Sequence, residues 1–233
     1  MDYLHDFRKD IVLKKRDKKY WSNWNDWNIL YKTLAYELSW SCDVERYCYV
    51  KKQVLEYFPD YKKYICGTTE LTLDIMNGWW FCFKELFGLK SRKSRETLEY
   101  LESLNKQIKH ITQKEELIRF INTEYKIEEK YTKALLEFLE VVYTIGNITQ
   151  VSENRHADCF DSWEYKLFKS DWMKYKKESD YMEYFVFNDY CEKWWDELKK
   201  CDDMKNKLLE YMNSRIYLIK ERGKKIITRE DRS

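Results

Sequence analysis

One stretch of the sequence, residues 146–162, gathers the polar side chains that a catalytic or binding site needs. It holds the densest cluster of turn-forming and polar residues in the chain, and helical periodicity resumes after it. We expect function here because irregular segments held between rigid elements commonly carry binding and catalytic groups. The polar members are Asn147, Thr149, Gln150, Ser152, Glu153, Asn154, Arg155, His156 and Asp158.

The familiar catalytic templates do not fit this segment. The sequence contains no H-E-x-x-H zinc motif, no G-x-S-x-G nucleophile elbow and no protein-kinase motif set. Asp158, Asp161 and Glu164 recur at every third position, but the aromatic residues between them favour an ordinary amphipathic helix. Helical two-histidine ribonuclease toxins usually carry an arginine a few residues before a histidine. Here Arg155 and His156 are adjacent, so that spacing is absent.

The run Tyr143-Thr144-Ile145-Gly146-Asn147 resembles a signature of a family of low-GC bacterial or phage proteins to which no activity is attached. This resemblance covers most of the chain and implies an intracellular protein of bacterial defence or mobile-element type. Further matching residues are Ile148-Thr149, Asn154-Arg155-His156, Asp161-Ser162-Trp163, Lys166-Leu167, Met76-Asn77, Trp79-Trp80, Ile216 and Arg222-Gly223-Lys224-Lys225-Ile226.

The same region is more faintly similar to the HNH-type nuclease domain that ends certain type IV restriction endonucleases. In that domain a His-Ile pair precedes a Gly-Asn-Leu-Thr strand, and a downstream Asn completes the site. Here His110-Ile111 precedes Gly146-Asn147-Ile148-Thr149, with Asn154 and His156 beyond. The resemblance implies that His110 would activate water, while Asn154 or His156 would help hold a divalent cation at the scissile phosphate.

This sequence departs from the nuclease pattern in three ways. Lys109 replaces the acidic residue before the histidine, the following proline is missing, and the intervening segment has the periodicity of long helices. On the alternative interpretation, His110 is a residue at a helix end. The nuclease is therefore the second hypothesis, and whether the protein is an enzyme stays open.

Two basic segments could contact phosphates. Residues 8–19 carry seven Lys or Arg against two Asp, and a second group of cations, beginning with Arg215, lies near the other end of the sequence. A solvated helix face is the commoner outcome for the first segment, and a favourable interaction with the helix dipole explains the second. The candidate binding residues are Asn147, Arg155, Lys14, Lys15, Arg16, Lys224 and Lys225.

Composition restricts the fold class. The chain has 233 residues, 43 Lys and Arg against 41 Asp and Glu, only five Gly and one Pro, but 10 Trp, 20 Tyr and 11 Phe. So much aromatic surface argues against disorder despite the low mean hydropathy of −0.80. The scarcity of Gly and Pro argues against glycine-loop nucleotide folds and many-turned β-sandwiches, and favours helices.

Cysteine usage and hydropathy predict a cytoplasmic location. The seven Cys form an odd set without a C-x-x-C pair, which indicates buried thiols in a reducing compartment rather than a disulfide framework or a structural zinc site. No apolar leader and no membrane-spanning stretch is evident, so we expect no membrane partner.

Periodicity places most of the chain in helices. An apolar stripe at steps of three and four runs from Trp21 through Trp24 and Trp27 to Leu38. Further helices are expected after Ser94 or Thr97, after a Thr112 capping box, from about Lys126 to Gly146, and over 204–219. Gly78, beside Trp79-Trp80 in a densely apolar stretch, indicates a close backbone approach or a kink.

These observations predict one mostly α, compact multi-helix domain over residues 1–233, with an irregular polar segment at 146–162 and a possible subdivision near 90–94. The preferred function is non-catalytic binding to a protein or nucleic-acid partner, without a cofactor. The alternative is the HNH-like nuclease, which would use a divalent cation. No metal-ligating residues are assigned.

Overall fold

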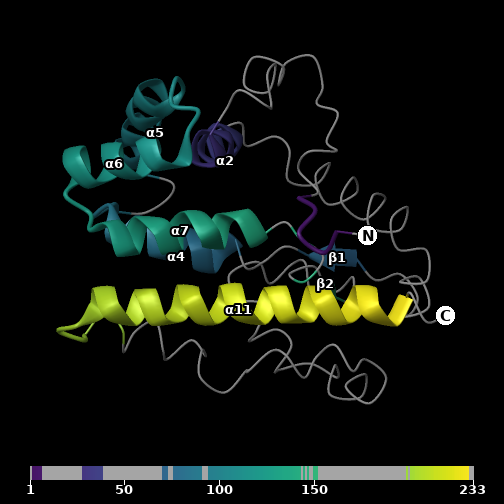
Figure 1. The fold of residues 1–233 in the computed structure, drawn as a ribbon. Coiled ribbons are helices and arrows are strands. Elements are labelled where there is room, and N and C mark those ends of the chain that lie inside the picture. The colour runs from purple at the N-terminus through teal and green to yellow at the C-terminus, as the bar shows by residue number, and fades with distance from the viewer. Residues whose placement is uncertain are drawn as a thin grey trace.

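The structure, a computed structural model, describes residues 2–6, 28–38, 70–72, 76–90, 94–142, 144, 146, 149–151, 198 and 200–230. Helices dominate this part of the chain, so the predicted mostly α fold class is confirmed (Figure 1). The elements are α2 (Ile29–Leu38), β1 (Glu70–Thr72), α4 (Met76–Leu86), α5 (Arg95–Ile108), α6 (Lys114–Tyr125), α7 (Glu129–Val141), β2 (Thr149–Val151) and α11 (Met204–Glu230).

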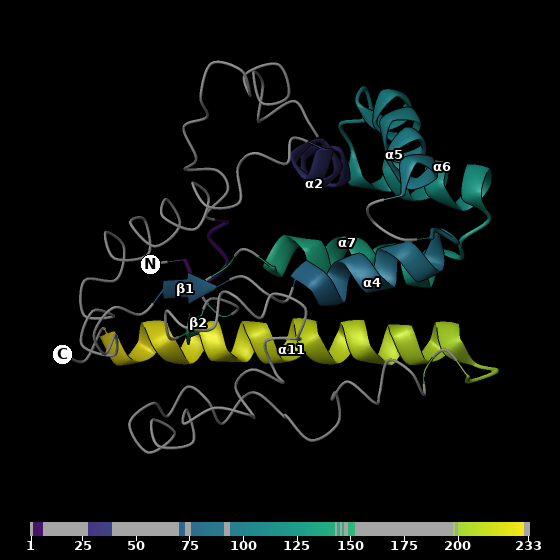
Figure 2. The same cartoon turned by 180° about the vertical axis from the view of Figure 1, so that it is seen from behind.

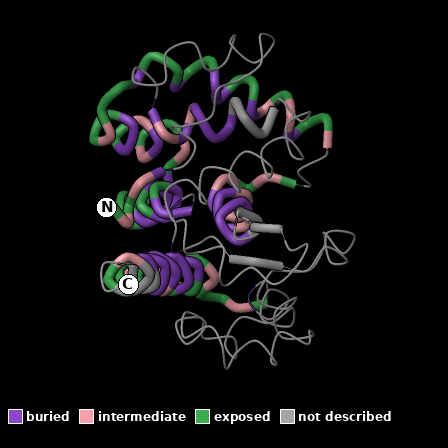
Figure 3. The backbone as a smooth tube through the Cα atoms, turned by 90° about the vertical axis from the view of Figure 1, so that its right-hand side faces the viewer, coloured by how far each residue is buried: buried purple, intermediate pink, exposed green. Residues whose placement is uncertain are grey.

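Helix α7 lies at the centre of the described helices. It contacts α11 on one side, α2 and α6 on the other, and α4 beside it. Figures 1 and 2 show α2, α5 and α6 as one layer, α4 and α7 as the next, and α11 as the long helix beneath them. Figure 3 shows that the buried positions of these helices face one another. The longest helix therefore supports the layer that contains α4 and α7.

Helices α7 and α11 run parallel. Near their beginnings, the Tyr131 hydroxyl donates to Asn206 Oδ1 at 2.9 Å. Further along, the rings of Phe138 and Tyr211 meet edge to face with centroids 6.0 Å apart. The nearly constant offset in residue number along this contact requires the two helices to advance in the same direction.

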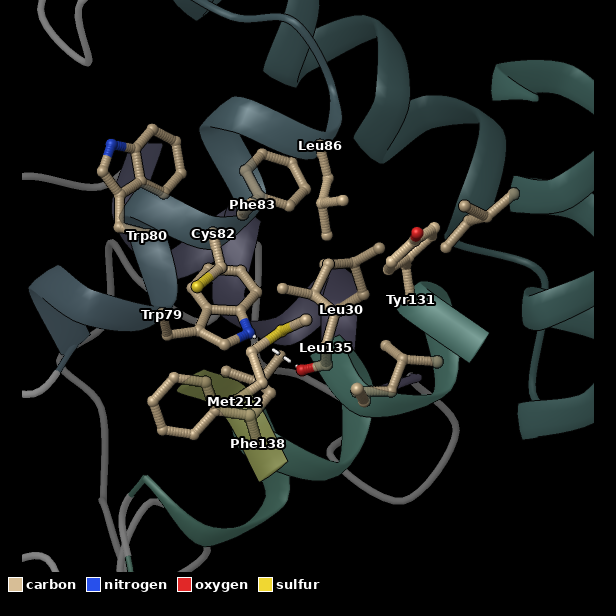
Figure 4. Close-up of a cluster of buried hydrophobic side chains, with 14 of the residues drawn as sticks. Leu30, Trp79, Trp80, Cys82, Phe83, Leu86, Tyr131, Leu135, Phe138 and Met212 are labelled. Atoms are coloured by element: carbon tan, nitrogen blue, oxygen red, sulfur yellow. Dashed lines mark hydrogen bonds between the residues drawn. The ribbon is translucent and has the colours of Figure 1, made fainter. Parts of the chain in front are cut away.

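The hydrophobic core centres on Trp79 of α4, which is fully buried (Figure 4). Its indole Nε1 donates to the backbone oxygen of Leu135 at 3.0 Å, and its ring stacks on Phe83 at 5.3 Å. The indole polar group thus has a partner inside an otherwise apolar cluster. Trp79 and Trp80, in the densely apolar stretch, are both buried, as are Leu30 and Leu34 of α2, which belong to the apolar stripe that ends at Leu38. Trp21, Trp24 and Trp27 lie outside the described residues.

Local capping chemistry explains the beginning of α5. Ser94 is its N-cap, and the Ser94 hydroxyl accepts a hydrogen bond from the Thr97 backbone N–H at 3.2 Å. That bond satisfies one of the N–H groups that the first turn leaves without an intrahelical partner. Of the two predicted caps, Ser94 is the correct one.

The predicted boundaries of the next two helices need correction. Helix α6 begins at Lys114 after an N-cap at Gln113 that makes no side-chain capping bond, so the Thr112 capping box is wrong. Lys126 is the left-handed C-cap of α6, with φ 52°, rather than the start of α7. A lone T-x-x-E pattern identified the neighbourhood of a helix start but missed the capping residue by one position.

The polar segment 146–162 is not wholly irregular. Its residues Thr149–Val151 form β2, which pairs antiparallel with β1 in the register Glu70 to Val151. A three-residue strand carries too little periodicity to be recognised from sequence, and its partner lies far away in the chain. Residues 152–162 lie outside the described part.

Of the helices within the described ranges, not one combines the length and apolar character that crossing a membrane requires. The described apolar cluster includes residues on both sides of positions 90–94, such as Phe83 and Leu101. The single domain over 1–233 and its possible subdivision stay predictions.

Candidate functional site

Gly146, where the polar segment begins, packs directly against the backbone of α11. A Cβ added there would overlap the carbonyl oxygen of Ile219 and would lie 2.9 Å from the backbone N of Gly223. Helix α7 already ends at Val141, so Gly146 does not terminate it as the sequence predicted. Because Gly146 has no side chain, its backbone can pack against that of α11. This long-range contact holds the start of the polar segment on α11.

Gly78 makes a second close contact with α11. A Cβ on Gly78 would overlap the Tyr211 hydroxyl and would lie 3.2 Å from Tyr211 Cζ. The predicted close approach at Gly78 is therefore confirmed. Gly78 and Gly146 thus both pack on α11, the first at Tyr211 and the second at Ile219 and Gly223.

A double-mutant cycle tests the Gly78 contact. Gly78→Ala should lower the free energy of unfolding by about 1–3 kcal/mol because the buried Tyr211 ring has no room to withdraw. In the Tyr211→Phe background the same change should cost at least about 1 kcal/mol less, since the overlapping hydroxyl is gone. Urea denaturation of the four proteins measures both costs. Equal costs in the two backgrounds would contradict the contact.

Arg215 lies between these two contacts and is fully buried. Its guanidinium carbon is 5.5 Å from the centroid of the Tyr211 ring. Because an arginine keeps its proton in proteins, α11 holds a permanent positive charge inside the fold. The sequence places Arg215 first among the C-terminal cations, and its burial removes it from the basic surface. Arg215 is four residues from both Tyr211 and Ile219, which places it on the apolar stripe of the helix. This spacing could have predicted its burial.

The N-terminal turn packs on the C-terminal half of α11. A Cβ on Gly223 would meet the Tyr3 ring at 3.3 Å, and Lys224 Nζ lies 5.8 Å from the centroid of that ring. The turn is closed by Asp2, whose side-chain Oδ1 accepts from the Leu4 N–H at 2.8 Å. The start of the described chain and the basic half of α11 therefore occupy one end of the molecule (Figures 1 and 2).

Lys224 is the candidate binding residue whose side chain the structure describes. It is exposed and forms an ion pair with Glu221 at 2.6 Å. The hydrogen bond and the charge of Glu221 raise the pKa of Lys224, with smaller contributions from Tyr3 and Tyr217. Lys225 belongs to α11, but its side chain is not described. Asn147, Arg155, Lys14, Lys15 and Arg16 lie outside the described residues.

His110 lies exposed in the turn between α5 and α6. Asn28 holds the backbone on either side, because its Nδ2 donates to the carbonyl oxygens of Ile108 at 2.6 Å and Ile111 at 2.8 Å. The proposed partners of His110, which are Asn154 and His156, lie outside the described residues. The helix-end interpretation describes the position of His110, and the nuclease assignment stays a prediction.

The surface of α5, α6 and α7 differs in charge from the end near Lys224. Residues 94–142 carry ten acidic side chains against eight Lys or Arg. Several of these cations are held by carboxylates, including Lys114 by Glu140 at 2.8 Å and Lys133 by Glu129. This surface offers mixed charge and no basic patch.

Two further findings concern the reactivity of a buried cysteine and the capacity of the described residues to bind a metal ion. Burial raises the pKa of the Cys82 thiol, so this cysteine stays protonated and is a poor nucleophile. Within the described ranges, no three His, Cys, Asp or Glu residues are grouped closely enough to hold a metal ion.

Comparison with protein families, with curated proteins and with solved structures found no match to this chain.

Proposed function

We propose that this protein acts without catalysis, by binding nucleic acid at the end of the molecule where the N-terminal turn packs on the basic C-terminal half of α11. We place this activity in the bacterial cytosol, in the defence or mobile-element setting that the signature resemblance implies. The observation that carries the proposal is the packing of Tyr3 against Gly223 and Lys224.

That contact matters because it joins two segments far apart in the sequence. The basic run 8–19 begins two residues beyond Asp6, and a chain of that length spans only about 7 Å. The other segment, residues 220–229 of α11, carries five Lys or Arg against one Glu. Covalent continuity therefore keeps the start of one basic segment near the N-terminal turn that packs on the other.

Concentrated cations of this kind suit the phosphate backbone of nucleic acids. Lys and Arg bind phosphates by displacing condensed counterions, and the affinity gained does not depend on base sequence. An acidic protein surface could attract the same cations. Nucleic acid is favoured because both segments are strongly one-sided in charge, in contrast to the mixed surface of residues 94–142.

Salt dependence provides the first test. Fluorescence anisotropy of labelled oligonucleotides should show the affinity falling about 50-fold or more between 50 and 200 mM salt if roughly four phosphates are neutralised. The combined change Lys224→Gln and Lys225→Gln should weaken binding and make the salt slope about two units shallower, roughly one for each lysine.

Lys130→Gln with Lys133→Gln is the matched control. It removes the same charge from the beginning of α7, which lies beside the beginning of α11 and about 30 Å from Lys224. The control pair should leave the affinity within about twofold of the parent. Binding that ignores salt would contradict the proposal and indicate a protein partner. An equal loss in both double variants would contradict the assignment of binding to the end near Lys224.

The same samples discriminate the nuclease alternative. Plasmid and RNA incubated with Mg²⁺ or Mn²⁺ should remain intact if the protein only binds. Cleavage that is lost in His110→Ala, Asn154→Ala or His156→Ala would instead support the HNH-like site.

A further inference from the structure

The outward face of α11 carries an exposed aromatic side chain. The buried positions of α11 include Leu208, Met212 and Ile219, and Tyr217 lies on the opposite side of the helix. Tyr217 is 64% exposed, and the other large hydrophobic side chain exposed in the described part of the chain is Leu4, at 39%. A single exposed aromatic residue is common on protein surfaces, so its surroundings decide its meaning.

Tyr217 stands beside the cations of the proposed binding end. Lys224 follows it by seven residues, two helical turns along the same face, and Tyr217 contributes to the electrostatic environment of the Lys224 ammonium. Lys220, three residues on, is half-buried on a neighbouring line of the helix. The exposed ring of Tyr217 and the ammonium groups of Lys220 and Lys224 therefore belong to residues within about 11 Å of one another along the helix axis.

We propose that Tyr217 stacks on an unpaired base and that the preferred ligand of this face is single-stranded nucleic acid. Exposed aromatic rings beside a cationic track bind single strands because every base offers a π-face while Lys and Arg hold the phosphates. Bases in a duplex are already stacked on one another, so a lone ring on a convex helix cannot reach them. The inference rests on the proposed function and adds the class of nucleic acid.

A protein partner is the competing ligand for an exposed tyrosine, because tyrosine is also enriched at protein interfaces. The charge around it favours nucleic acid, because residues 220–229 of α11, which follow Tyr217, carry five Lys or Arg against one Glu. A purely electrostatic role for this face makes a different prediction, because it would not distinguish bases from bare phosphates.

The test compares four ligands of one length by anisotropy: single-stranded DNA, single-stranded RNA of the same sequence, the DNA duplex, and an abasic DNA strand. Tyr217→Ala should weaken binding of both single strands by about 5- to 100-fold. It should leave the affinity for the abasic strand and the duplex within about twofold, since these retain the phosphates but offer no free base. Tyr217→Phe should keep most of the single-strand affinity.

Asn213→Ala is the control, because Asn213 is exposed one turn earlier on the same face. It should change no affinity, and circular dichroism should show the same helix content in all variants. Equal losses for the abasic and the intact strand, or no loss with Tyr217→Ala, would overturn the stacking role while leaving the proposed function standing. Absence of salt-dependent binding to any of the four ligands would overturn both.

Discussion

Gly146→Ala should lower the free energy of unfolding by about 3 kcal/mol or more, the upper end of the range for overpacking a well-filled site. The new methyl group would meet backbone atoms of Ile219 and Gly223 in α11, and these cannot rotate away as the end of a side chain could. Relief would require α11 to move away from the segment that follows α7. Urea denaturation followed by circular dichroism measures the loss.

Gly88→Ala separates this contact from the general cost of replacing a glycine. Gly88 has φ +65°, a left-handed conformation, but no atom lies within 4 Å of an added Cβ. Alanine there should cost about 1 kcal/mol through backbone strain alone. If Gly146→Ala were no more destabilising than Gly88→Ala, the tight packing of Gly146 on α11 would be wrong.

Trp79→Ala should cost about 3–5 kcal/mol, which is a large share of the stability of an ordinary domain. It removes the largest fully buried side chain among the described residues and leaves a cavity between α4, α7 and α11. Denaturant titration should show a lower midpoint, and the protein should be poorly folded if its total stability is near the lower end for domains.

Trp79→Phe separates the cost of losing apolar volume from the cost of losing the indole hydrogen bond. Phenylalanine keeps most of the apolar volume beside Phe83 but loses the hydrogen bond to the Leu135 carbonyl, so a loss of about 1–2 kcal/mol is expected. The exposed Tyr217→Ala should stay within about 0.5 kcal/mol of the parent. A similar loss for Trp79→Ala and Tyr217→Ala would contradict the central position of Trp79.

Features that depend on neighbouring residues could be predicted from the sequence. Apolar spacing indicated the α11 stripe, and Ser94 has the hydroxyl side chain that is favoured at the N-cap of a helix. The close approach at Gly78 could also be anticipated, because a glycine next to two tryptophans in an apolar stretch leaves space that a neighbouring element can fill.

Features that depend on distant residues could not be predicted in this way. Gly146 looked like a helix terminator because the residues of α11 that it contacts, Ile219 and Gly223, lie more than 70 positions away in the chain. The pairing of β1 with β2 and the burial of Arg215 depend equally on which helices become neighbours. The proposed binding end depends on the contact between Tyr3 and α11, and neither basic segment carries a sequence feature that specifies this contact.

The parallel pairing of α7 with α11 also governs the order in which the chain can fold during synthesis. About 60 residues separate the end of α7 from the start of α11. At usual translation rates, α11 therefore begins to be synthesised about 3–12 s after α7 is complete. During that interval the faces of Phe138 and Trp79 that later meet α11 have no native cover, and hydrophobic surface exposed in this way promotes aggregation. The nascent chain should therefore depend on chaperones until α11 has been made.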